Sequence, residues 1–148
     1  MGLTVRDDPK KVVDVAGRTW GEPVDGIALS MQLKPREDPD ELSTVSVAIR
    51  NTGAARCTLR TRGWLEYFHV TVRDSSGAEA AFTPYGRELM KPENAPSPAE
   101  IELEPGEATE ADIPIESIYR MKGTYRVQAW CATPEGGRAF SNEIEVRA

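Results

Sequence analysis

The sequence predicts an all-β protein, a sandwich of two antiparallel sheets built from about seven or eight short strands. Three observations predict it. Apolar and polar residues alternate over several short segments, turn residues separate these segments, and no segment carries an apolar stripe at helical spacing. Short strands between turns favour two packed sheets over a layered arrangement of helices and strands. The length of 148 residues fits one domain.

Three segments in the first half of the chain show the alternation most clearly. They are residues 24–34 (VDGIALSMQLK), 42–53 (LSTVSVAIRNTG) and 67–77 (YFHVTVRDSSG). Every second residue is apolar in each, so those side chains share one face of a half-buried strand. Between them lie an acidic turn at 35–41 and a short expected strand at 56–60 (RCTLR).

The second half follows the same pattern. Residues 99–115 (AEIELEPGEATEADIPI) predict a strand, a Pro-Gly turn and another strand. Residues 123–133 (GTYRVQAWCAT) and 138–148 (RAFSNEIEVRA) flank a Gly-Gly turn and predict a closing hairpin. Residues 115–123 (IESIYRMKG) fit a single short helical turn.

One proline-rich stretch interrupts this pattern. Residues 83–99 (TPYGRELMKPENAPSPA) contain prolines at 84, 92, 96 and 98, which exclude a central strand. We therefore expect a long loop, and loops of this length are often functional, although structural packing or mobility explains them as well. The side chains that it would present are Tyr85, Arg87, Met90 and Lys91.

The composition excludes several classes of function. The net charge of −6 disfavours a nucleic acid or an anionic membrane surface as partner. No run of about 18 apolar residues is present, so we expect no transmembrane segment. Charged residues between 6 and 11 interrupt the apolar core that a signal peptide needs, which slightly favours the cytoplasm unless a leader has been removed. We expect residues 1–26 to pack on a sandwich formed by residues 27–148.

Five segments resemble a known group of domains in their order along the chain. They are VSVAIRNTG (45–53), FHVTVRDSSG (68–77), LEPGEATE (103–110), GTYRVQAW (123–130) and SNEIEVRA (141–148). Together they resemble bacterial immunoglobulin-like β-sandwich domains, which include the intracellular proteinase inhibitor family and macroglobulin-like and transglutaminase-tail sandwiches. The resemblance implies an immunoglobulin-like arrangement of the two sheets. Inhibitor activity does not follow from it, because one fold hosts many functions.

The two cysteines raise the question of a disulfide. Cys131 shares the core-facing parity of Val127 and Ala129, where a bridge between sheets could form, and Cys57 is the other cysteine. Two features oppose the bridge. Cys57 falls on a different strand from the one that an antibody-type bridge uses, and Ala129 stands where such domains have a tyrosine. Buried thiols are the alternative.

No defensible catalytic or metal site is found in the sequence, and we expect no cofactor. His69 is the single histidine, and nothing places it in a triad with Asp74, Ser75 or Ser76. Two cysteines and one histidine cannot supply the usual four zinc ligands. The acidic turn with Glu37, Asp38, Asp40 and Glu41 could meet calcium, but its spacing is not that of a helix-loop-helix site and solvated surface explains it as well.

Aromatic side chains on an outer face provide the candidate binding site. Tyr67 and His69 have outward parity on one strand and Trp130 on another, and the resemblance implies that these strands are neighbours. Tryptophan and tyrosine are favoured anchors in protein interfaces. We expect, however, that the N-terminal segment, with Trp20 and the valines at 12, 13 and 15, folds back over this face and buries it; an exposed interface is the alternative.

Three hypotheses of function follow. The first is a non-enzymatic binding or protein-interaction module whose protein partner is unidentified. The second is a proteinase inhibitor that presents Arg87, Met90 or Lys91 from the 83–99 loop. The third is a carbohydrate-binding accessory domain in which Trp130 and Tyr67 form a sugar platform.

Overall fold

The computed structural model describes residues 17–38, 40–61, 69–91, 93 and 99–148, and every structural statement below concerns these residues. They form nine strands and two short helices, so the predicted all-β class is confirmed. The strands are β1 (Ile27–Leu33), β2 (Val45–Asn51), β3 (Cys57–Thr61), β4 (His69–Asp74), β5 (Ala99–Leu103), β6 (Ala108–Ile113), β7 (Thr124–Ala132), β8 (Arg138–Phe140) and β9 (Ile144–Arg147). The helices are α2 (Pro84–Leu89) and α3 (Ile115–Ile118), and α3 is the short helical turn expected from the sequence.

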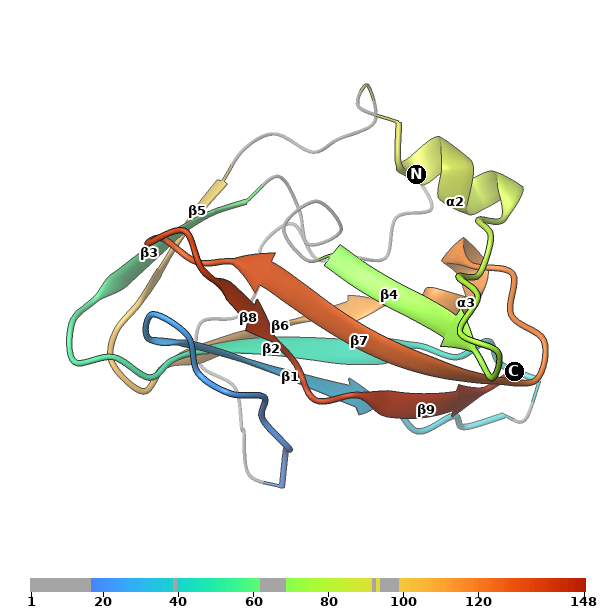
Figure 1. Cartoon of the computed structure of the whole chain (residues 1–148), viewed down its shortest axis with the longest axis horizontal. Helices are drawn as coiled ribbons and strands as arrows, with labels where there is room; N and C mark the ends of the chain where they lie inside the picture. Colours follow the sequence, from blue (N-terminus) through green and yellow to red (C-terminus); the bar gives the residue numbers. More distant parts are fainter. Residues whose placement is uncertain (1–16, 39, 62–68, 92, 94–98) are drawn as a thin grey trace.

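The strands form three antiparallel groups (Figure 1). One sheet has the order β1-β2-β6. A second has β7 at its centre, with β4 along one edge and both β8 and β9 along the other. β3 and β5 form a separate two-stranded ribbon. The first two sheets face each other as the two layers of a sandwich.

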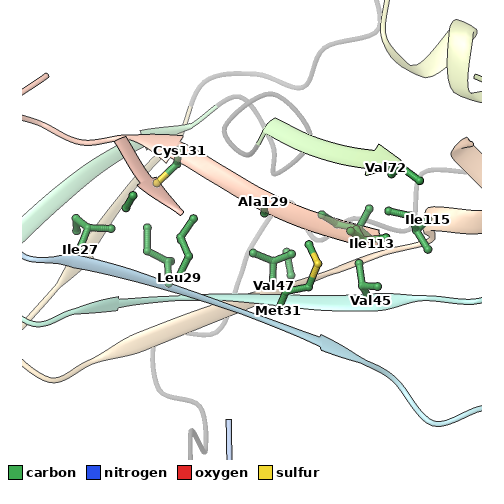
Figure 2. Packing of buried hydrophobic residues seen from close by; sticks show 14 of the residues in the cluster. Ile27, Leu29, Met31, Val45, Val47, Val72, Ile113, Ile115, Ala129 and Cys131 are labelled. Carbon is green, nitrogen blue, oxygen red and sulfur yellow. The ribbon is translucent and has the colours of Figure 1, made fainter. Parts of the chain in front are cut away.

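The core lies between these two layers. Figure 2 shows Leu29 and Met31 of β1 and Val47 of β2 on one side, with Ala129 and Cys131 of β7 on the other. All five side chains are at most 2% exposed. Full burial of a residue such as leucine or valine contributes about 1.5–3 kcal/mol, so this layer is the main source of stability. The alternation read from the sequence is therefore the alternation between core and surface.

The side-chain amide of Asn142 and the backbone of Gly21 cover part of the open edge of β1. The Asn142 side chain accepts a hydrogen bond from Met31 N at 2.7 Å and donates one to Met31 O at 3.0 Å, as a neighbouring strand would. Further along the edge, Gly21 N donates to Leu29 O at 2.9 Å. Covering an edge in this way removes a template for pairing with other chains. Asn142 lies in the break between β8 and β9, so residues 138–148 form two strands and not one continuous strand.

The prediction of a loop throughout residues 83–99 is wrong in its first part. Thr83 is the N-cap of α2, and its Oγ1 accepts a hydrogen bond from Gly86 N at 2.9 Å. Pro84 occupies the first turn, where its missing N–H costs nothing. Gly86 packs against Ile118, since a Cβ added to Gly86 would lie 2.1 Å from the Ile118 carbonyl oxygen. Pro84 therefore begins a helix and does not lie in an irregular loop.

Candidate binding face

A row of three aromatic side chains crosses the outer face of the β7 sheet. Trp130 lies between the buried residues Ala129 and Cys131, so its side chain points away from the core. His69 of β4 lies directly opposite Trp130 on one side, and Phe140 of β8 lies opposite it on the other. We call His69, Trp130 and Phe140 the aromatic row.

The members of the aromatic row are in contact. The ring centroids of His69 and Trp130 are 4.0 Å apart and their planes differ by 12°, which is a stacked arrangement. The centroids of Trp130 and Phe140 are 6.2 Å apart, with planes tilted by 37°. The first distance is that of rings stacked in direct contact, and the second lies in the range of about 4.5–7 Å in which tilted aromatic pairs attract each other. The row is therefore a pre-ordered surface that would lose little side-chain entropy on binding.

Arg138 completes the surface. Its guanidinium carbon lies 4.4 Å from the centroid of the Trp130 ring, a cation–π contact. β4 and β8 lie on opposite sides of β7, so His69 and Arg138 approach the indole from opposite sides. His69 and Arg138 are exposed, Phe140 is 43% exposed and Trp130 is half-buried among them.

The predicted grouping of His69 with Trp130 agrees with this geometry, whereas Tyr67 lies outside the described residues. Sequence reasoning missed Phe140 and Arg138. Their outward parity around buried Ala139 was available in the sequence. What was missing was the register across the 133–137 turn, which sets Phe140 opposite Trp130.

Trp20 does not cover the aromatic row. Its ring lies under the Arg50 guanidinium at 4.6 Å, and its backbone forms a bridge with Ser30. Arg50 and Ser30 belong to β2 and β1, so Trp20 packs on the other sheet of the sandwich. The expectation that Trp20 helps to bury Trp130 is therefore wrong. The valines at 12, 13 and 15 lie outside the described residues.

A polar network anchors the same N-terminal segment to the outer face of β1-β2-β6. Only 5% of the Arg18 side chain is exposed, and its Nη1 lies 3.5 Å from a carboxylate oxygen of Glu110. The guanidinium donates to Ser30 Oγ at 3.2 Å and to the Ser46 carbonyl at 3.0 Å. Arg18 and Glu110 thus pair within the chain on this face, whereas His69, Trp130 and Phe140 lie on the β7 sheet.

The four loop candidates lie on α2 and its C-terminal end. Tyr85 is half-buried against the core, and Arg87 is exposed. Met90 is the C-cap in a helical conformation and is 36% exposed, and Lys91 Nζ pairs with Glu88 at 2.9 Å. They are held on a helix and its cap, not along an extended loop.

Neither cysteine belongs to a disulfide, and both are thiols. Cys131 is fully buried in the core. Cys57 is half-buried on β3, which pairs with β5 and not with β7. Burial raises the pKa of the Cys57 thiol, so little of it is the reactive thiolate near neutral pH.

The sequence cluster at residues 74–76 is a turn. Asp74 Oδ1 accepts hydrogen bonds from Ser76 Oγ at 2.6 Å, Ser76 N at 2.9 Å and Ala78 N at 3.0 Å. The Ser76 hydroxyl, followed by the backbone donors, lowers the pKa of the Asp74 carboxyl. Asp74 therefore caps a turn after β4. Within the described part of the chain, no three His, Cys, Asp or Glu side chains gather as a metal site.

The acidic turn also has a local role. Asp38 Oδ1 accepts from Asp40 N at 3.0 Å, and Glu41 N donates to the Asp38 carbonyl at 3.0 Å. These contacts are those of a short surface turn between β1 and β2.

No protein-family model and no curated protein matches this chain. Neither of the two helices is long and apolar enough to cross a membrane.

Proposed function

We propose that this protein is a non-enzymatic protein-interaction module that binds its partner through the aromatic row. The observation that carries the proposal is the alignment of His69, Trp130 and Phe140 across three adjacent strands on a solvent-facing sheet. Interface hot spots are enriched in tryptophan and cluster in ordered, partly desolvated surroundings. Phe140 supplies accessible apolar area, and the Trp130 ring beside it is ordered by its contacts with its neighbours.

The immunoglobulin-like class is part of the proposal. Two facing antiparallel sheets of short strands, together with the order of the five resembling segments, support it. Domains of this architecture often bind through exposed sheet faces or loops, but the fold alone does not identify the partner.

Affinity capture with immobilised protein tests the proposal. Wild-type protein, Phe140→Ser and Leu42→Ser are compared, because Leu42 is an apolar residue more exposed than Phe140, 53% against 43%, in the segment between β1 and β2. We expect a cellular protein to be retained by the wild type and by Leu42→Ser and to be lost with Phe140→Ser. Equal retention by all three proteins would count against the aromatic row.

The two other hypotheses have weaker support. A protease cleft takes up an extended segment, whereas Arg87 lies within α2 and Met90 is its helical cap. Rapid cleavage by trypsin-like and subtilisin-like proteases without inhibition would eliminate the inhibitor hypothesis.

A sugar platform needs an open aromatic face, but His69 and Arg138 contact Trp130 from opposite sides. Absence of binding on a glycan array would eliminate that hypothesis.

A further inference from the structure

The residues before β1 form one arm of a short hairpin. Val24 and Ile27 exchange both of their backbone hydrogen bonds, each at 2.9 Å, so Asp25 and Gly26 are the two central residues of a tight turn. We call residues 17–24 the arm. The two-residue turn joins the arm to β1 and is therefore the hinge between the arm and the rest of the fold.

Side chains of the arm are seated on the outer face of the β1-β2-β6 sheet. Arg18 donates hydrogen bonds to β1 and β2 and pairs with Glu110 of β6 at 3.5 Å, and the Trp20 ring lies under Arg50 of β2 at 4.6 Å. These contacts lie away from the hinge. They would be the same if the arm came from a second copy of this chain, because the sheet that receives the arm is identical in both copies.

The hinge is held in a left-handed backbone conformation. Asp25 has φ 51° and Gly26 has φ 79°. Glycine adopts such values freely and aspartate less readily, so an extended hinge would release Asp25 from a disfavoured conformation. Two hydrogen bonds keep the turn closed: Thr133 Oγ1 donates to the Asp25 carboxylate, and Thr52 N donates to Gly26 O at 2.8 Å. Short, strained hinge loops favour the exchange of an element between copies.

We propose that the arm exchanges between two copies of this chain. In the resulting dimer, the arm of each copy lies on the β1-β2-β6 sheet of the other copy, and the hinge is extended. Monomer and dimer share the contacts of Arg18 and Trp20 and differ at the hinge. The hinge and the protein concentration therefore set the balance between them. The aromatic row lies on the other sheet, so this dimer is separate from the partner binding proposed above.

A pair of charge-exchanged full-length variants tests the proposal. Arg18→Glu and Glu110→Arg each place like charges on the arm and on its own sheet. In an equimolar mixture, both ion pairs re-form only when each arm lies on the other copy. We expect each variant alone to be a monomer and the mixture to be a heterodimer that melts at a higher temperature, measured by size-exclusion chromatography with light scattering and by thermal denaturation.

Two controls accompany the mixture. Arg18→Glu and Glu110→Arg combined in one chain restore opposite charges within that chain, so this double variant should behave as the wild type. Arg56→Glu mixed with Glu104→Arg exchanges the charges of an exposed pair outside the arm. We expect no dimer from that mixture.

Hinge variants test the same proposal without changing any charge. A Cβ added to Gly26 would have Gly53 as its nearest neighbour, at 3.5 Å, so Gly26→Val acts through the backbone and not through a clash. Valine disfavours the closed turn, and we expect the dimerisation constant to rise at least tenfold over that of the wild type. Gly77→Val is the matched control, because Gly77 has φ 86° and open space in a different turn. It should not promote the dimer.

Three results would overturn the exchange of the arm. They are a charge-exchanged mixture that stays monomeric, equal dimerisation of Gly26→Val and Gly77→Val, and a dimer that Phe140→Ser abolishes, which would assign the contact to the aromatic row. If the single charge variants do not fold alone, they are refolded together from urea. Recovery of a folded heterodimer then supports the exchange, and recovery of none contradicts it.

Discussion

The imidazole of His69 stacks on the indole of Trp130 across the β4–β7 pair, with ring centroids 4.0 Å apart. The contact lies on the solvent side of the sheet, so it orders a surface and adds little to the core. The effect of the His69–Trp130 contact on the stability of the fold can therefore be measured separately from its effect on binding.

Trp130→Ala should lower the free energy of unfolding by about 1–2 kcal/mol. Large aromatic truncations in cores cost about 3–5 kcal/mol, but Trp130 is half-buried, and among the described residues its ring contacts are with His69, Phe140 and Arg138 on the outer face of the sheet. Urea denaturation measures the change. A loss above about 3 kcal/mol would mean that Trp130 is a core residue, and no loss would mean that the row is not ordered.

Arg18→Ala should destabilise the protein by about 2–4 kcal/mol, because it removes a nearly buried cation and leaves Glu110 without its ion-pair partner. Arg56→Ala is the matched control. Arg56 also pairs with a glutamate, Glu104, at 2.6 Å, but both side chains are more than half exposed, so we expect a loss below about 1 kcal/mol. Equal losses in urea denaturation would contradict the role of Arg18 as the anchor of the N-terminal segment.

Tyr119 should make stability depend on alkaline pH. Burial, followed by the charge of Glu79, raises the pKa of its hydroxyl to about 12, against about 10 in an unfolded chain. Above pH 10 the unfolded state loses this proton first, so the free energy of unfolding falls by roughly 2–3 kcal/mol as the pH rises to 12.

The comparison for this prediction is Tyr119→Phe, which retains the stacking with Phe82 and lacks the titrating hydroxyl. Its stability should decline less between pH 10 and 12, and ultraviolet titration of the wild type should show one phenol that ionises near pH 12. The same pH dependence in both proteins would refute the assignment.

Both thiols should react with a thiol reagent after denaturation without reductant, giving two equivalents per chain. In the native state we expect Cys131 to be protected, because it is fully buried, and Cys57 to react slowly. Recovery of no thiol from a monomeric sample would instead establish a Cys57–Cys131 bridge and argue for an oxidising compartment.

Some of the architecture depends on contacts that no local pattern reveals. The helix α2 escaped prediction because its six residues are too few for a visible apolar stripe and the prolines of residues 83–99 suggested a loop. Between β8 and β9, Asn142 bonds to Met31, 111 residues away in the chain. Such long-range hydrogen bonds leave no periodic trace in the sequence.

By itself, the sequence determined the all-β class, most of the strands and the outward direction of His69 and Trp130, because a period of two records which face of a strand meets the core. Only the tertiary structure decided which side chains lie beside His69 and Trp130. Register across the β7–β8 hairpin set Phe140 opposite Trp130 and Arg138 over its ring, and packing of the N-terminal segment sent Trp20 to the other sheet. Parity is a local property of each strand, whereas register and sheet packing arise from contacts between distant segments.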